Sequence, residues 1–160
     1  MIIILEGPDG SGKSTLAKQL SDQLGLEIIP RGKPETQEEK DIMMDMYLKL
    51  IKSGKSFILD RSWYSEMVYG KIMRDSSYIN EDQMLALEYQ VLFNGGGLIV
   101  HCLDTTWNLW DRCQTRGEDY ITDYNTLDKI NKKFNEVFDD IEHIIPVVRY
   151  SIPLIKEVVK

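Results

Sequence analysis

The sequence predicts an α/β fold in three layers, in which helices flank a parallel sheet of about five strands. Short apolar runs alternate with longer stretches of helical period, which is typical of strand–helix–strand units. The short runs are mostly apolar on both faces, as strands are when helices cover both sides of a sheet. No internal repeat or linker divides the 160 residues, so we expect a single domain over residues 1–160.

The apolar runs place strands at residues 2–6, 27–30, 56–59, 98–103 and 146–150. The helical pattern places helices at residues 14–24, 37–52, 81–92, 105–115, 126–143 and 153–159. Gly25 follows the first of these helices and Gly54 lies just beyond the second, where glycine commonly ends a helix. Pro153 suits the first turn of the last helix, because an amide hydrogen is not needed there.

The composition and charge of the chain limit the partners and the cellular location that we expect for the protein. A formal net charge of −7 argues against broad binding to nucleic acid, which normally requires a basic face. No apolar run approaches the ~20 residues of a membrane span, so we expect no membrane contact. The first strand leaves no room for a signal peptide, and Cys102 and Cys113 are too few for a disulfide framework. We therefore expect a cytoplasmic protein.

Residues 7–14, GPDGSGKS, fit the phosphate-loop pattern G-x-x-x-x-G-K-[ST] between a predicted strand and a predicted helix. The glycines let successive N–H groups point inward, and the helix offers its positive end to a phosphate. Lys13 is expected to reach the outer phosphates, and the Ser14 hydroxyl is placed for Mg²⁺. The residues assigned to nucleotide binding are Gly7, Asp9, Gly10, Ser11, Gly12, Lys13, Ser14 and Thr15.

Asp60 and Arg61 directly follow the predicted strand at residues 56–59. Ligands of open α/β sheets gather at the carboxyl ends of the strands, so this pair is expected beside the phosphate loop. Asp60 can hold the Mg²⁺ shell or take a proton from an attacking hydroxyl, and Arg61 can clamp a phosphoryl group with two hydrogen bonds. The alternative is a structural ion pair with a capping aspartate.

Two stretches, EGPDGSGKST and GKSFILDRSWYSEMVYG, resemble the thymidylate kinase group of nucleoside and nucleotide kinases. Val68 stands where that group has alanine, and the glutamine before Gly70 is missing. Asp60-Arg61-Ser62 instead resembles the D/E-R-S signature of deoxynucleoside kinases. The positions that match the thymidylate kinase patterns are Glu6, Gly7, Asp9, Gly12, Lys13, Ser14, Gly54, Lys55, Asp60, Arg61, Ser65 and Tyr69.

The resemblance implies a phosphate-loop kinase fold that uses ATP and Mg²⁺. It implies that Asp9 accepts from the 3′-hydroxyl of an acceptor sugar, although Asp9 is also an ordinary turn residue after Pro8. It places Arg31 near the acceptor phosphate, but the surrounding T-R-E-P-G pattern is lost here. By the same analogy, adenine meets the segment near residues 151–154.

Residues 104–122, DTTWNLWDRCQTRGEDYIT, resemble the mobile lid of these kinases, which we place at about residues 112–123. Arg112 and Arg116 are four residues apart, so a helix would direct both toward one side. Both would then close over the transferring phosphoryl group, as an arginine finger supplied in cis. The alternative is a solvated helical face with Arg112 paired to a nearby acid.

Aromatic residues just beyond Arg61 are candidates for the walls of an acceptor pocket, because a base needs flat apolar surfaces. These residues are Trp63, Tyr64 and Tyr69, and burial in the core is the alternative for each. No histidine or cysteine has a partner at zinc-type spacing, so Mg²⁺ is the only metal we infer.

The acceptor remains open between two classes. A nucleoside monophosphate brings an anionic nucleophile and needs arginines such as Arg31 and Arg61, whereas a nucleoside hydroxyl needs a base such as Asp60. We favour a deoxynucleoside monophosphate, thymidylate-like. The alternatives are a deoxynucleoside, a modified pyrimidine hydroxyl within DNA, which the net charge disfavours, and, last, a non-catalytic nucleotide-binding module. Family members are often dimers, so a homodimer is expected.

Overall fold

In a computed structural model, which describes residues 1–31, 34, 36–117 and 121–152, the strands form one parallel sheet in the order β2-β3-β1-β4-β5. The five strands are β1 Ile2–Glu6, β2 Glu27–Pro30, β3 Phe57–Asp60, β4 Gly97–Cys102 and β5 Val147–Tyr150. Each lies within two residues of its predicted position, because the apolar runs that fill a parallel sheet are short and well separated. The predicted fold class is confirmed.

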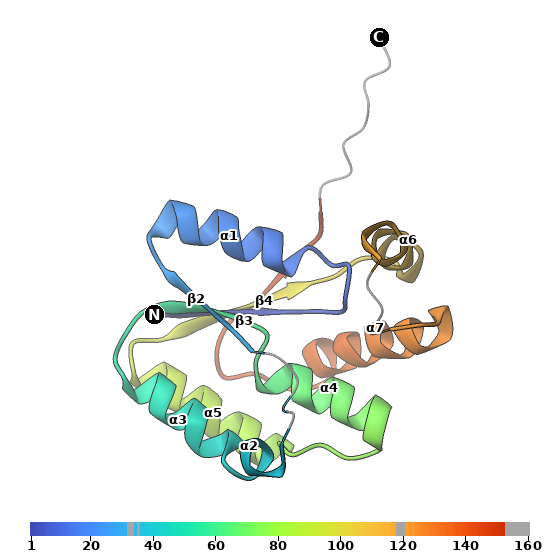
Figure 1. The fold of residues 1–160 in the computed structure, drawn as a ribbon. Coiled ribbons are helices and arrows are strands. Elements are labelled where there is room, and N and C mark those ends of the chain that lie inside the picture. Colours follow the sequence, from blue (N-terminus) through green and yellow to red (C-terminus); the bar gives the residue numbers. More distant parts are fainter. Residues whose placement is uncertain (32–33, 35, 118–120, 153–160) are drawn as a thin grey trace.

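Helices cover both faces of this sheet (Figure 1). The helices are α1 Lys13–Leu24, α2 Gln37–Asp41, α3 Met43–Lys52, α4 Trp63–Arg74, α5 Glu81–Phe93, α6 Thr106–Arg116 and α7 Tyr124–Asp139. Ala17 of α1 packs against Ile3 and Leu5 on one face. On the other face, α3, α4, α5 and α7 pack against Ile2 and Ile4 in the larger core. Alternate residues of β1 thus enter opposite cores, as the period of a strand requires.

Helix α4 is absent from the sequence prediction. Its residues are buried on almost every side, so no polar stripe marks a helical period in the sequence. Ser62 caps its first turn and Asp75 ends it in the left-handed conformation, with φ 57°. The helix predicted at residues 37–52 is divided at Ile42, which has a non-helical ψ of 3°. The helix predicted at residues 153–159 lies outside the described residues.

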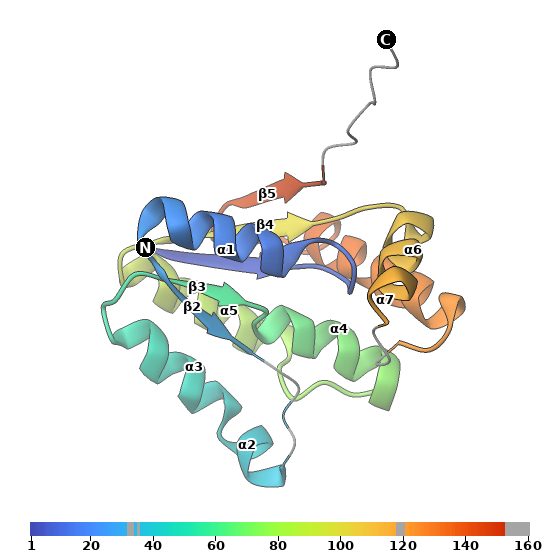
Figure 2. The same ribbon diagram turned by 45° about the horizontal axis from the view of Figure 1, so that its top comes forward.

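The carboxyl ends of three neighbouring strands, β2, β3 and β1, lie at one edge of the sheet (Figure 2). The phosphate loop follows β1, Arg31 follows β2 and Arg61 follows β3. Leu5 and Pro30 are both in register with Asp60, which fixes the three strand ends at one level. None of the described helices is long and apolar enough to cross a membrane.

Candidate active site

The phosphate loop is held closely against β4 and α6. Gly7 has φ 148°, and a Cβ there would lie 2.1 Å from the carbonyl oxygen of Cys102. Gly10 has φ 79°, and a Cβ there would lie 2.6 Å from the carbonyl oxygen of Leu109. Only glycine combines these backbone conformations with such close approaches. A side chain at either position would therefore displace the loop from β4 or α6.

Lys13 lies inside this loop, with 5% of its surface exposed. Its Nζ donates hydrogen bonds to the carbonyl oxygen of Pro8 at 2.7 Å and to the Ser11 hydroxyl at 3.2 Å. Burial lowers the pKa of Lys13 to about 8, and the nearby positive charge of Arg61 adds to this effect. A bound phosphate would replace these neutral acceptors with a negative charge.

The two residues predicted to hold Mg²⁺ lie in direct contact. The Ser14 hydroxyl donates to Asp60 Oδ2 at 2.9 Å, from the start of α1 to the end of β3. Hydroxyl and carboxylate oxygens are ligands that Mg²⁺ accepts, and a nucleotide-bound ion takes most of its other ligands from phosphate and water. No cluster of three or more histidines, cysteines or acids able to hold a metal occurs within the described ranges. The residues present thus fit an ion that arrives with a nucleotide.

Asp9 and Arg61 form an ion pair beside the loop. Arg61 Nη2 lies 2.5 Å from Asp9 Oδ1, and the Tyr69 hydroxyl donates to Asp9 Oδ2 at 2.9 Å. Burial would lower the pKa of Arg61, but Tyr69 and then Asp9 raise it. The backbone of Arg61 has a φ of 72°, which is a strained conformation for any residue other than glycine. Arg61 and Tyr69 therefore offset the negative charge of Asp9 from within the protein.

Glu6, which sequence reasoning left without a role, organises this region from beneath. It is fully buried and accepts from the amide and hydroxyl of Ser62 at 2.6 and 2.7 Å. It also accepts from the amide and hydroxyl of Ser65 at 3.2 and 2.6 Å. Burial raises the pKa of Glu6, and the serine hydrogen bonds oppose that rise. Glu6 thereby fixes the start of α4 to the end of β1.

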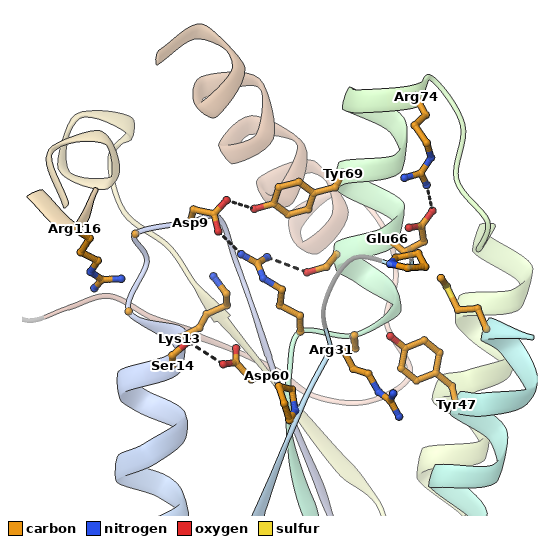
Figure 3. A pocket seen from close by; sticks show the side chains of 18 residues that line it. Asp9, Lys13, Ser14, Arg31, Tyr47, Asp60, Glu66, Tyr69, Arg74 and Arg116 are labelled. Atoms are coloured by element: carbon orange, nitrogen blue, oxygen red, sulfur yellow. Dashed lines mark hydrogen bonds and ion pairs between the residues drawn. The ribbon is translucent and has the colours of Figure 1, made fainter. Parts of the chain in front are cut away.

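A cavity of about 570 Å³ joins the phosphate loop to α3 and α4 (Figure 3). Ten of the predicted site residues line it: Asp9, Gly10, Gly12, Lys13, Ser14, Arg31, Asp60, Arg61, Tyr69 and Arg116. The lining side chains that the sequence prediction missed include Met43, Tyr47, Ser62, Ser65, Glu66 and Arg74. These come mainly from α3 and the unpredicted α4, so no local pattern pointed to them.

Trp63 and Tyr64 do not line the cavity. Both are fully buried, and the Trp63 ring packs edge-on against Tyr47, 5.2 Å between centroids. The Tyr64 hydroxyl donates to the buried Glu88 at 2.6 Å. This placement corrects the prediction that they wall the acceptor pocket. The first turn of α4 faces the sheet, so its large side chains enter the core.

The two candidate lid arginines have separate positions. Arg112 donates to Asp104, 2.5 Å away, and to the carbonyl oxygen of Gly10 at 2.9 Å. It therefore ties α6 to the back of the phosphate loop, in the acid pairing considered as its alternative. Arg116 lines the cavity beside the loop (Figure 3). Thr15 is exposed on the first turn of α1, and the Ser11 hydroxyl donates to the carbonyl oxygen of Pro8 at 2.7 Å, while Gly7, Ser11 and Thr15 are not among the lining residues of the cavity. Residues 118–120 of the predicted lid are outside the described ranges.

The site combines a phosphate loop, a buried lysine, a serine–aspartate pair and several arginines at the carboxyl edge of a parallel sheet. This combination defines a phosphate-loop kinase. The comparisons with known proteins specify the family. A sequence model of the family polyphosphate kinase 2 (PPK2) matches residues 1–94, and the chain belongs to that family. The likeness to thymidylate kinases stays a prediction.

Several known proteins resemble the chain over most of its length. The SPbeta prophage-derived uncharacterized protein YorR of Bacillus subtilis (strain 168) is 29% identical over 139 residues, which are 87% of this chain and 82% of YorR. The crystal structure of YorR in complex with phosphorylated GDP has 27% identity and a TM-score of 0.78, covering 94% of this chain and 85% of that one.

More distant structures share the fold. Deoxyadenosine kinase from M. mycoides with dCMP and dCDP bound has 19% identity and a TM-score of 0.62, over 94% of this chain and 90% of that one. A gluconokinase from Sinorhizobium meliloti 1021 has 13% identity and a TM-score of 0.57, over 94% of this chain and 83% of that one.

Proposed function

We propose that the protein transfers the γ-phosphoryl group of ATP to a deoxynucleoside monophosphate. One observation carries this proposal: a single cavity holds the phosphate loop, the Ser14–Asp60 pair and Arg31 and Arg61 together. Donor phosphates, metal and an anionic acceptor would therefore meet in one space. The volume of about 570 Å³ is in the range of small-molecule sites.

The arginines favour an acceptor that already carries a phosphate. Arg31 Nη1 reaches only the weak acceptor Met46 Sδ at 3.3 Å, and its buried Nε has no partner among the described residues. A phosphate oxygen would satisfy such a donor with a charge-assisted hydrogen bond. Asp60 accepts from Ser14 on the metal side of the site, which suits a metal ligand better than a general base. A phosphate nucleophile needs no such base.

The remaining roles follow from position. Lys13 would neutralise the outer phosphates, and Arg61 and Arg116 would stabilise charge on the transferring group. Mg²⁺ held near Ser14 and Asp60 would supply further neutralisation of the phosphate oxygens. Asp9, held by Arg61 and Tyr69, retains lone pairs for a sugar hydroxyl. Arg112 would position the loop through Gly10 rather than touch the phosphates.

Three phosphoryl donors are candidates for this site: ATP, GTP and polyphosphate. The family name suggests polyphosphate as a donor, and YorR holds a phosphorylated GDP. ATP, GTP and polyphosphate, each with Mg²⁺, should therefore be offered in parallel. We expect ATP to be used, because the phosphate-loop pattern of residues 7–14 is typical of proteins that bind nucleoside triphosphates.

The test is a phosphoryl-transfer screen against deoxynucleoside monophosphates, deoxynucleosides and oligonucleotides with normal and modified pyrimidines. Asp60→Asn should abolish turnover, and Asp22→Asn, at an exposed site on α1, should leave it unchanged. Transfer to deoxynucleosides or to DNA in place of monophosphates would overturn the acceptor assignment. Tight nucleotide binding without transfer to any acceptor would show a binding module instead.

A further inference from the structure

The end of the cavity away from the phosphate loop holds a partly buried ion pair. Glu66 and Arg74, both on α4, line the cavity, and Arg74 Nη2 donates to Glu66 Oε1. The amide of Tyr78 donates to the same oxygen at 3.0 Å. The Glu66 side chain is only 6% exposed. Figure 3 shows this pair on the opposite side of the cavity from Lys13 and Ser14.

The helix is built around this pair. Gly70 lies one turn from each partner, and a Cβ there would lie 2.8 Å from both Glu66 Oε1 and Arg74 Nη2. The Arg74 guanidinium also lies over the ring of Tyr78, with its Cζ 4.6 Å from the centroid. The missing side chain at Gly70 makes room for the ion pair, and Tyr78 holds it from the other side. Contacts within the protein thus hold both charged groups at the cavity wall.

Each partner keeps a polar atom that the protein does not use. Within the described part of the chain, the hydrogen bonds of Glu66 all end at Oε1, which leaves Oε2 without a donor. Arg74 Nε is buried and has no acceptor among the same residues. A buried donor without a partner, such as Arg74 Nε, is costly and therefore rare. Glu66 Oε2 can therefore accept from an amino group of a ligand in the cavity, and the guanidinium of Arg74, which also lines the cavity, can donate to an acceptor atom next to that amino group.

We propose that Glu66 and Arg74 select an acceptor nucleotide whose base carries an exocyclic amino group, an inference that rests on the proposed function. The amino group of adenine, guanine or cytosine donates to Glu66 Oε2, and the neighbouring ring nitrogen or carbonyl accepts from Arg74. Met43 and Tyr47, both buried in the cavity wall, supply apolar contact.

Thymine and uracil do not fit this arrangement. Their single ring N–H lies between two carbonyl oxygens, so a carboxylate that accepts from it also faces a carbonyl dipole of the wrong sign. The chemistry of this end of the cavity thus opposes the thymidylate-like preference expected from the sequence.

The test measures equilibrium binding and turnover for two matched pairs of nucleotides, dCMP against dUMP and dGMP against dIMP. Within each pair, an amino group is exchanged for a carbonyl or removed. Wild type is compared with Glu66→Gln and with Glu142→Gln, an exposed residue near the opposite end of the sheet. We expect wild type and Glu142→Gln to favour the amino member of at least one pair by about 10-fold or more.

Glu66→Gln should reduce that preference by about 10-fold, since its amide can also donate to a carbonyl. Equal binding within both pairs, or a preference that survives in Glu66→Gln, would overturn the inference. A wild type that binds with the expected preference but transfers nothing would instead refute the proposed function. If Glu66→Gln does not fold, the two nucleotide pairs measured with the wild type alone test the preference for an amino-bearing base.

Discussion

The Ser65 hydroxyl donates to the buried carboxylate of Glu6, 2.6 Å away, and accepts from Arg61 at 3.2 Å. Arg61 in turn holds Asp9 in the phosphate loop. One hydrogen-bonded series therefore runs from the end of β1, through the first turn of α4, to the cavity. The position of the site depends on a residue that does not line it.

Glu6→Gln should lower the free energy of unfolding by about 1–3 kcal/mol, because the new amide directs donors toward the donors of Ser62 and Ser65. Urea unfolding measures the loss. Glu27→Gln, at an exposed position on β2, should change the same quantity by less than about 0.5 kcal/mol. Equal effects of the two substitutions would show that the Glu6 hydrogen bonds contribute little.

Gly10→Ala should weaken ATP binding by about 10-fold or more, because the new Cβ would meet the Leu109 carbonyl and displace the loop. Gly25→Ala is the matched control. Gly25 has a similar φ of 66°, but no atom lies within 4 Å of a Cβ there. Both variants carry the strain of a positive φ, about 1 kcal/mol. Isothermal titration should find weaker ATP binding only in Gly10→Ala. An equal loss of ATP affinity in both variants would instead show that backbone strain is the cause.

The affinity for ATP should fall as the pH rises through about 8, where buried Lys13 loses its proton in the free protein. A bound phosphate stabilises the charged amine, so binding takes up a proton above this pH and weakens. Lys13→Arg should bind ATP more weakly but without this fall, because arginine stays charged. An unchanged wild-type affinity from pH 7 to about pH 9, at constant ionic strength, would contradict the lowered pKa.

The sequence predicted those parts of the fold and site whose signals are local. The phosphate loop and the Asp60–Arg61 pair each stand directly after an apolar strand, and the parallel sheet brings such ends together. Glu66 and Tyr47 could not be found in this way, since they enter the cavity from helices whose packing is set by the whole core. Arg112 and Arg116 share α6, but Arg112 donates to the carbonyl oxygen of Gly10 whereas Arg116 lines the cavity. Which of these side chains reaches the cavity depends on packing between elements that are far apart in the sequence.

His143 and Glu88 should make the stability of the fold depend on pH. Burial would lower the pKa of His143, but its hydrogen bonds to Glu88 at 2.7 Å and to the Val137 carbonyl at 2.8 Å raise it. The stabilisation is therefore fully present below the ordinary pKa of 6.5 and is lost as the pH rises through the raised value.

His143→Gln should lower the free energy of unfolding by about 3 kcal/mol near pH 6.5, and by less near pH 9. His101→Gln is the control, because burial lowers the pKa of His101 to about 4 and leaves it neutral throughout this range. Urea unfolding of the three proteins between these pH values measures the difference, and a His143→Gln deficit that does not shrink with rising pH would show that His143 is not protonated in the fold.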